Sequence, residues 1–408
     1  MNFTILGLRN LLRNYRRSLI TVLSIAIGFA AITLFAGYVQ TTYRGLSEQA
    51  IYGELLGHLT IAKRGLTKEG RLHPEKYLLA GNEIEQITAI VRKNVNNVSI
   101  APRLGINGLL SNGHVSTIFL AEGIAPHDME MLRGPRRNAS GGLSADTQSG
   151  VTVARGLAEM LGLKEGSDAS LLVSTLHGQA NALDVTITDT FSTGNAGTED
   201  KFMFIPLALA QSLFDADDRA DRLTVLLPDV AQTDNVRMQL ATQLQTAGFD
   251  LEISTWKELS AFYYQVKSMF DMIFGFLLAI VVAIIVMSIT NAMTMSVVER
   301  TREIGTMRAI GVHRSSVVRL FATEAFLLVM LGCLAGLAVT FLIRFGVNAA
   351  DITYQPPNST GTIPLLIGFD LTKAIISAAV LSLLSITAAI LPARRAAGRP
   401  IIDALGHV

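Results

Sequence analysis

Four long apolar runs divide this chain, and each is long enough to cross a lipid bilayer. A hydrocarbon core of about 30 Å requires about 20 mostly apolar residues in an α-helix. The pattern therefore predicts four membrane-spanning helices, over residues 19–39, 270–296, 317–345 and 371–392. The first run is longer than the apolar core of a cleaved secretory signal, so we interpret it as an uncleaved anchor.

Between the first two runs, the pattern changes to short alternating segments and amphipathic stretches. Residues 57–63 alternate as in a strand, and residues 99–124 predict two strands joined by the turn signal Ser111-Asn112-Gly113. Helical spacing predicts further helices over 81–95, 153–163, 205–214 and 231–248. The fold class is therefore a four-helix membrane protein with a large extracytoplasmic α+β domain, residues 40–266, between its first two spans.

A short charged segment, "VVERTREIGTMRAIGVHRSS" (297–316), lies between the second and third runs. Ile304, Met307 and Ile310 recur at three-residue intervals, and Gly311 is a typical stop signal. The pattern predicts an amphipathic helix over Glu299–Gly311. Its charged residues are Glu299, Arg300, Arg302, Glu303 and Arg308.

Two interpretations of this amphipathic helix remain open from the residues alone. It can lie on the inner leaflet, with its arginines on lipid phosphates. It can instead dock into a groove of a partner protein, which its mixed charge slightly favours because acidic residues gain nothing from anionic lipid.

Composition and charge placement support a membrane protein and predict its orientation. Only 16% of the residues are charged, against about 25% in soluble domains. Residues 40–266 hold 19 Lys and Arg and 26 Asp and Glu, a net charge of −7, and the rest of the chain carries +8. The positive-inside rule assigns the basic segments 1–18, 297–316 and 393–408 to the cytoplasm and the loop 346–370, which has no Lys or Arg, to the outside. Basic residues at span ends usually meet membrane lipids, and nothing indicates nucleic acid.

The sequence lacks the motifs of the common catalytic and metal-binding classes. Its one cysteine, Cys333, lies in the third span, so no disulfide can form within the outer domain, and no metal-site spacing occurs. A phosphate loop and the usual hydrolase motifs are absent. We therefore expect a chain that is not an enzyme and holds no cofactor or metal of its own.

Few polar residues lie within the predicted spans. Glu324, in the third span, is a functional candidate by default, but pairing with a nearby Arg close to the membrane interface is the favoured interpretation. Gly28 in the first span and the Gly332-x-x-x-Gly336 pattern in the third allow close helix packing. Such patterns are common and do not by themselves identify a dimer face.

Several segments resemble one family of membrane proteins. "VVERTREIGTMRAIGVHRSSVVRLFATEAFLLVMLGCLAGLAV" is similar to the core signature of FtsX/MacB-type ABC transporter permeases. The segments "LPARRAAGRPIIDALGHV" and "LGLRNLLRNYRRSLITVLSIAIG" resemble that family's ending and opening. The resemblance covers nearly the whole chain and agrees with the predicted topology.

This resemblance implies a permease subunit that works with other proteins. ATP and Mg would be bound by an ABC ATPase dimer, with no ATPase fused to this chain, and a second permease copy, identical or paralogous, would complete the complex. The charged helix would be the coupling helix that contacts the ATPase. The implied polar contacts are Arg300, Arg302, Glu303 and Arg308, the implied apolar anchors are Ile304 and Met307, and Glu299, Gly305 and Gly311 complete the segment.

The family resemblance also implies how the outer domain is built and used. A porter-like part would comprise residues 56–135 and 220–255, with an inserted subdomain at 145–215. ATP-driven motion of this domain, called mechanotransmission, would serve lipoprotein release of the LolC/LolE kind or MacB-like efflux in the bacterial inner membrane, with a periplasmic adaptor, chaperone or lipoprotein as a further partner. The alternative is an FtsX-like scaffold that activates an extracytoplasmic cell-wall hydrolase.

Overall fold

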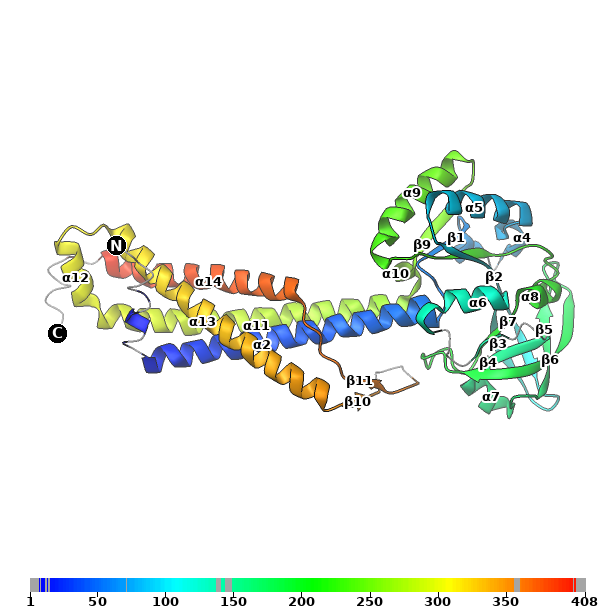
Figure 1. Ribbon diagram of the computed structural model, residues 1–408, viewed down its shortest axis with the longest axis horizontal. Coiled ribbons are helices and arrows are strands. Elements are labelled where there is room, and N and C mark those ends of the chain that lie inside the picture. Colours follow the sequence, from blue (N-terminus) through cyan, green and yellow to red (C-terminus); the bar gives the residue numbers. More distant parts are fainter. Residues whose placement is uncertain are drawn as a thin grey trace. The chain divides into compact units, whose positions relative to one another are not determined.

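The computed structural model describes residues 15–70, 72–136, 141–143, 149–355 and 360–398, together with Gly7, residues 9–11, Arg13 and Pro400. Parts of the predicted segments 1–18, 145–215 and 393–408 lie outside the described residues. The chain forms two compact units (Figure 1). The helical unit comprises Met1–Tyr43, Val266–Thr353 and Pro364–Val408, and the α/β unit comprises Arg44–Gln265 and Tyr354–Ile363.

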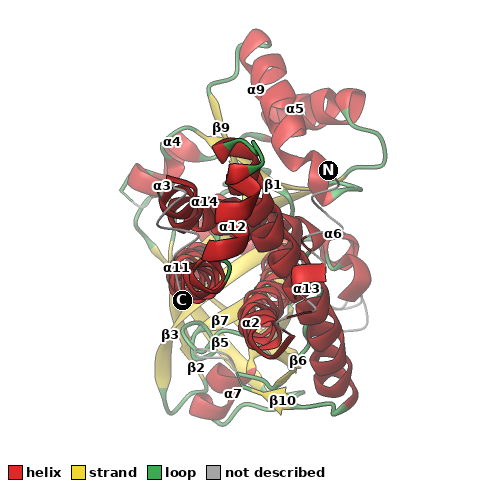
Figure 2. Ribbon diagram, turned by 90° about the vertical axis from the view of Figure 1, so that its left-hand side faces the viewer, coloured by secondary structure: helices red, strands yellow, loops and turns green. Residues whose placement is uncertain are grey.

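The helical unit contains the four predicted spans. They are α2 (Tyr15–Glu48), α11 (Ala261–Glu299), α13 (Arg314–Ala349) and α14 (Leu371–Gly398), and all four are long and apolar enough to cross a membrane. Figure 2 shows these helices close to end-on. A short helix, α12 (Thr301–Ala309), connects α11 to α13, and the strands β10 (Thr353–Tyr354) and β11 (Ile363–Pro364) pair in the loop before α14.

Glycines allow α2 to pack closely against two other membrane helices. A Cβ added at Gly28 would lie 2.7 Å from Cγ1 of Val281 on α11, and one at Gly332 would lie 2.5 Å from Cγ2 of Ile25 on α2. At Gly336 the nearest atom would be the Ala26 carbonyl oxygen, at 2.8 Å. The predicted packing glycines therefore serve contacts within this chain.

The α/β unit is built on nine strands. In sheet order they are β3 (Ser116–Ile124), β7 (Phe202–Pro206), β4 (Gly150–Ala154), β6 (Ala180–Phe191), β5 (Asp168–Ser174), β2 (Ser99–Ser111), β8 (Arg222–Leu226), β1 (Leu59–Lys63) and β9 (Leu251–Thr255). The helices are α3 (Leu66–Glu69), α4 (Pro74–Tyr77), α5 (Gly81–Asn94), α6 (Pro126–Leu132), α7 (Arg155–Leu161), α8 (Leu207–Phe214), α9 (Thr233–Thr246) and α10 (Trp256–Leu259). Short helical turns occupy Gln49–Gly53, Gly134–Arg136 and Val230–Gln232.

One part of this unit is a four-stranded antiparallel layer covered by two helices on one face. Its strand order is β2-β8-β1-β9, and the chain order β1-α5-β2 and β8-α9-β9 is that of a split β-α-β fold. The apolar side chains of alternate strand positions pack against those of α5 and α9, among them Leu59, Ile61, Ile87, Val91, Leu223, Val225, Leu240 and Ile253. Strand alternation and helical spacing together produce this core.

The other part is a closed ring of six strands. Because β2 pairs with both β3 and β5, the pairings run β2-β3-β7-β4-β6-β5 and return to β2. Two of its strands, β4 and β7, were not predicted, since residues 153–163 and 205–214 indicated helices. The helices exist but begin later, at Arg155 and Leu207. Both missed strands are short and almost fully buried, so they show no alternation.

The boundary between these two parts falls inside β2, earlier than the expected division at residues 135–145. The first residues of β2 pair with β8, whereas its last residues pair with β5. Leu104, Ile106, Leu110 and Phe119 belong to the core of the ring. The segment from about Leu104 to Ile124 therefore belongs to the ring rather than to the porter-like part.

Candidate functional site

The charged segment between α11 and α13 forms the short helix α12, as the sequence predicts. Glu299 ends α11, Arg300 breaks the helix with φ −108° and ψ 17°, and α12 spans Thr301–Ala309. Gly311 has a positive φ of 93°, and its N–H donates to the Arg308 carbonyl oxygen at 3.1 Å. This turn suits glycine and ends the helix where the sequence indicated.

The apolar stripe of α12 faces the helical unit itself. Ile304 is 2% exposed and belongs to the core formed by the membrane helices, and Met307 packs against that core. Gly305 is also buried. The implied role of Ile304 as an anchor for a partner is therefore corrected, because its surface is already covered within this chain. By contrast, Ile310 is 77% exposed.

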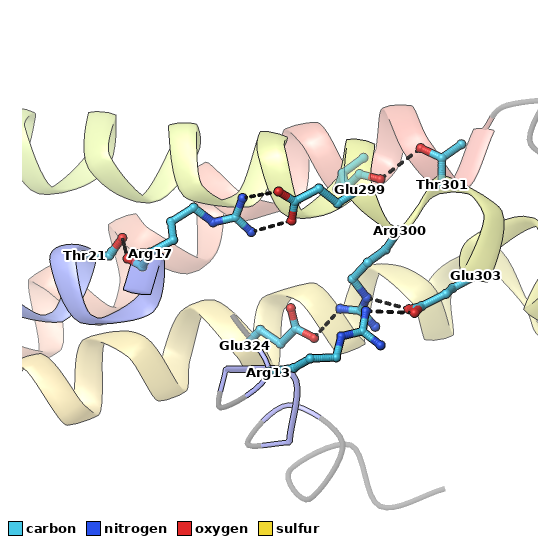
Figure 3. A network of polar contacts seen from close by, with 9 residues as sticks. Arg13, Arg17, Thr21, Glu299, Arg300, Thr301, Glu303 and Glu324 are labelled. Carbon is cyan, nitrogen blue, oxygen red and sulfur yellow. Dashed lines mark hydrogen bonds and ion pairs between the residues drawn. The ribbon is translucent and has the colours of Figure 1, made fainter. Parts of the chain in front are cut away.

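Arg300 is the centre of a polar network beneath α12 (Figure 3). It is 5% exposed; its Nη1 lies 2.7 Å from Glu324 Oε1, and its Nε lies 2.9 Å from Glu303 Oε2. Burial alone would lower the pKa of Arg300, but Glu324 and Glu303 outweigh burial and raise it. The guanidinium also lies 5.5 Å from the ring centroid of Phe321.

Glu324 is held in place by this network. It is 2% exposed on α13, and Asn10 Nδ2 donates to the same Oε1 at 2.5 Å. The favoured interpretation, pairing with an arginine, is confirmed. The partner is Arg300, although Arg319 is closer to Glu324 along the sequence. A cavity of about 20 Å³ beside Arg300 and Glu324 has room for one water molecule.

The N-terminal arginines pair with the acidic residues around α12. Arg17 donates to both carboxylate oxygens of Glu299, at 3.1 and 3.0 Å, and Arg13 lies 2.8 Å from Glu303 (Figure 3). The pKa of Glu303 is lowered, because hydrogen bonds from Arg300 and Arg13 outweigh its partial burial. These two pairs are partly exposed, so each contributes about 0–1 kcal/mol to stability.

Arg308 links α12 to the last membrane helix. Its Nη1 donates to the carbonyl oxygen of Ala397 near the end of α14. A cation near the C-terminal carbonyls of a helix is favoured by the helix dipole. Two of the arginines expected to contact a partner, Arg300 and Arg308, are therefore engaged within the chain.

Two family descriptions match this chain over most of its length. Residues 18–243 match the MacB-like periplasmic core domain, and residues 275–401 match the FtsX-like permease C-terminal domain. The chain belongs to the FtsX/MacB-type ABC transporter permeases. It is thus a multi-pass inner-membrane permease, and the α/β unit is its MacB-like periplasmic domain.

Individual relatives agree with this family. The "Pyoverdine export ATP-binding/permease protein PvdT" of Pseudomonas entomophila (strain L48) is 23% identical over 83% of this chain and 51% of its own length. The "Macrolide export ATP-binding/permease protein MacB" of Salmonella paratyphi A (strain ATCC 9150 / SARB42) is 30% identical over 45% of this chain and 27% of its own length. The permease thus spans about half the length of PvdT. The periplasmic region of MacB from Actinobacillus actinomycetemcomitans superposes with a TM-score of 0.35 and 14% identity, over 53% of this chain and 92% of that structure.

In this permease, the exposed face of α12 and its surroundings is basic. Arg302 on α12 is exposed, as are four further arginines on α13 and α14: Arg314, Arg319, Arg394 and Arg395. Within the described part of the chain, none of these five side chains forms an ion pair. These arginines and the exposed Ile310 lie on α12 and at its end, on the first turns of α13 and on the last turns of α14.

The sequence did not identify the residues that hold α12 in place. Asn10, Arg13 and Arg17 were recognised only as part of the basic segment 1–18. Glu299 and Glu303, the partners of Arg17 and Arg13, were assigned to the coupling segment, and Glu324, the partner of Asn10, was expected to pair with an arginine. The available signal was charge complementarity between the segments 1–18 and 297–316. Choosing among the pairs required the fold, because the partners are more than 280 positions apart.

Proposed function

We propose that this permease transmits the energy of ATP hydrolysis, performed by a partner ABC ATPase, to its periplasmic domain. The attachment of α12 is the observation that supports this proposal. Arg300 binds Glu324 on α13, Arg308 binds α14, and Arg17 of α2 binds Glu299 at the end of α11. A displacement of α12 is therefore passed to the ends of all four membrane helices.

The chain itself connects these helices to the periplasmic domain. The helix α2 continues to Glu48, beyond the start of the α/β unit at Arg44, and α11 begins at Ala261, before that unit ends at Gln265. Motion of either helix thus reaches the domain through continuous backbone. This connectivity suits mechanotransmission, in which the substrate is moved by the domain rather than through the membrane.

The proposed contact with the nucleotide-binding domain is the exposed side of α12. Arg302 and Ile310 replace Ile304 as the central residues, with Glu303 at the edge of the surface. A dimer of ATPases, which bind ATP and Mg, and a second permease copy would complete the complex. In this arrangement α12 and both chain ends face the cytoplasm, and the α/β unit faces the periplasm.

We propose that this permease serves lipoprotein release or the export of another periplasmic substrate. The names of PvdT and MacB describe export proteins, and the match to the MacB-like periplasmic core domain covers more than half of the chain. A periplasmic adaptor, chaperone or lipoprotein would be the further partner. No feature of the described residues favours the alternative, a scaffold that activates a cell-wall hydrolase.

Charge reversal at Arg302 tests the coupling role. In the Arg302→Glu and Ile310→Asp variants, we expect the ATPase activity of the intact complex to lose its dependence on the permease, while membrane insertion is retained. Lys164→Glu is the matched control, because Lys164 is exposed in the periplasmic domain. Unchanged activity in both α12 variants would overturn the proposal.

A further inference from the structure

The face of the four-stranded layer opposite α5 and α9 carries two ordered rows of side chains. Backbone pairing aligns Arg103, Arg222, Ala62 and Glu252 in one row across β2, β8, β1 and β9. The next row on the same face contains Ala101, Thr224, Thr60 and Ser254. Residues one position away, such as Ile61 and Leu223, point to α5 and α9, as strand alternation requires.

A cavity of about 210 Å³ lies over these rows. The polar rows form its floor, and Ala62 leaves room between Arg222 and Glu252. Leu56, Leu66 and Leu259 contribute aliphatic walls. A concave site with apolar walls and a few convergent polar groups is the usual form of a small-molecule site.

Two buried polar groups of the cavity lining have no hydrogen-bond partner among the described residues. They are Nε of Arg103, whose residue is 2% exposed, and Oγ1 of Thr224, whose residue is fully buried. The two Nη atoms of Arg103 are used, by the Leu55 carbonyl and by Glu122 at 3.1 Å. An N–H group and a hydroxyl left without partners are uncommon in a folded interior and call for an acceptor.

The charges around the cavity are balanced except at one end. Arg103 and Arg222 are paired with Glu122 and Asp221, and Lys63 is paired with Glu83 at 3.0 Å. Glu252 is exposed at the other end of its row and forms no ion pair within the described part of the chain. The nearby Arg64, whose pKa is raised by Asp250 and to a smaller extent by Glu252, is paired with Asp250 at 2.7 Å, so two carboxylates share one cation there. The site therefore offers hydrogen-bond donors at one end and a net negative charge at the other.

We propose that this cavity binds a small amphipathic molecule with a carbonyl oxygen, aliphatic groups and a positively charged end. The carbonyl oxygen accepts hydrogen bonds from Arg103 and Thr224, and the aliphatic groups contact the leucine walls. The positive end lies near Glu252, two strand spacings across and two residues along the sheet from Thr224, a distance of about 12 Å. This site is separate from α12, so the inference does not rest on coupling to ATP.

Three dipeptides that differ only in end charge test the proposal. Leucyl-leucine amide is positively charged at pH 6.5, N-acetyl-leucyl-leucine amide is neutral, and N-acetyl-leucyl-leucine is negatively charged. Calorimetric titration of the full chain in lipid nanodiscs should give saturable binding of the positive peptide. We expect its affinity to exceed that of the negative peptide at least about tenfold, which corresponds to about 1.4 kcal/mol.

Two variants and a matched control connect this binding to the cavity. Thr224→Val removes the buried hydroxyl and should weaken binding of the positive peptide about fivefold. Thr152→Val is the control, because Thr152 is also fully buried with an unpartnered Oγ1 but lies on β4, outside the cavity. Glu252→Gln should reduce the preference for the positive peptide to about twofold or less.

Each measurement can contradict the proposal. Absence of saturable binding, equal binding of the positive and negative peptides, or unchanged affinity in Thr224→Val would overturn it. Equal weakening in Thr224→Val and Thr152→Val would also overturn it, because the effect would then not belong to the cavity. Fluorescence of Trp256, the chain's one tryptophan, verifies that each variant is folded.

Discussion

Arg300 is a buried cation whose charge is balanced by carboxylates from two different elements. Glu324 comes from α13 and Glu303 from α12, and Asn10 completes the shell around Glu324. Removing one member of a buried ion pair leaves the other charge uncompensated, which is costlier than replacing both by apolar groups. Replacing Glu324 alone should therefore reduce stability more than replacing Arg300 and Glu324 together.

Replacing Glu324 alone should destabilise the helical unit strongly. We expect Glu324→Leu to lower the free energy of unfolding by about 3 kcal/mol, and the Arg300→Leu, Glu324→Leu double variant to lower it less. Arg13→Leu is the control, because its pair with Glu303 is exposed and contributes about 0–1 kcal/mol. Thermal unfolding in one detergent measures all three; a double variant less stable than Glu324→Leu would contradict this account.

His58 makes the periplasmic domain sensitive to acid. Its side chain is buried, its Nδ1 accepts a hydrogen bond from the Leu227 N–H at 2.9 Å, and burial lowers its pKa to about 4. Between pH 6.5 and 4 the unfolded chain binds more protons than the folded one, so stability is lost as pH falls through this range. We expect a loss of about 3 kcal/mol by pH 4, measured by urea unfolding with Trp256 fluorescence. A His58→Gln variant should lack this component, and an unchanged pH profile in that variant would refute the assignment.

At the scale of elements, the contact between α2 and α13 depends on the absence of side chains. Gly332 and Gly336 lie against Ile25 and Ala26, and Thr33 and Thr340 share a buried hydrogen bond of 2.7 Å further along the same pair of helices. Membrane helices associate through close packing and such polar contacts, since lipid provides no hydrophobic drive. A larger residue at this interface must therefore separate the helices.

Gly332→Val should disrupt this interface, whereas Gly346→Val should not. A Cβ at Gly332 would lie 2.5 Å from Ile25, but one at Gly346, on the same helix, has no atom within 4 Å. Overpacking of this kind costs about 1–3 kcal/mol, so we expect a lower melting temperature for Gly332→Val alone. Equal melting temperatures for the two variants would show that α2 and α13 do not pack as described.

The element α12 also illustrates the limits of a helical pattern. Periodicity correctly predicted the helix and grouped Ile304, Met307 and Ile310 into one stripe, but Ile310 is exposed and lies one residue beyond the end of α12. It could not determine whether that stripe faces a partner or the chain itself, because both give the same spacing. The buried side chain of Ile304 decided this point, and the exposed side chain of Ile310 belongs to the face proposed above for the ATPase contact.

At the scale of the whole molecule, the four spans and the charge distribution imply that α12 and the loop before α14 lie on opposite sides of the membrane. Both segments contain exposed residues suited to chemical labelling, including Thr306 on α12 and Thr362 in the loop. The single native cysteine, Cys333, is buried and can be replaced by alanine. The topology is therefore accessible to a direct experiment.

Single cysteines in a Cys333→Ala background should label from different sides. We expect Thr362→Cys to react with a membrane-impermeant maleimide in cells with a permeabilised outer membrane. Thr306→Cys should react only after the inner membrane is opened, because the positive-inside rule assigns the basic segments to the cytoplasm. The reverse pattern would overturn the orientation.

The larger features of this permease follow from its sequence for simple physical reasons. Spans of about 20 apolar residues, the turn at Ser111-Asn112-Gly113 and the stop at Gly311 are local signals, and each is read correctly without knowledge of the fold. The strands β4 and β7 were missed because strands buried on both faces do not alternate. Their positions follow from pairing with β3 and β6, residues distant along the chain.

The sequence by itself determined the membrane class, the four spans, the domain between the first two and the presence of a charged helix between the second and third. These properties depend on composition and on spacing within one segment. Only the tertiary structure decided that Arg300 binds Glu324, that Ile304 faces inward, and that Arg103, Thr224 and Glu252 line one cavity. Each of these depends on segments far apart in the chain, whose proximity is set by packing and strand register rather than by local pattern.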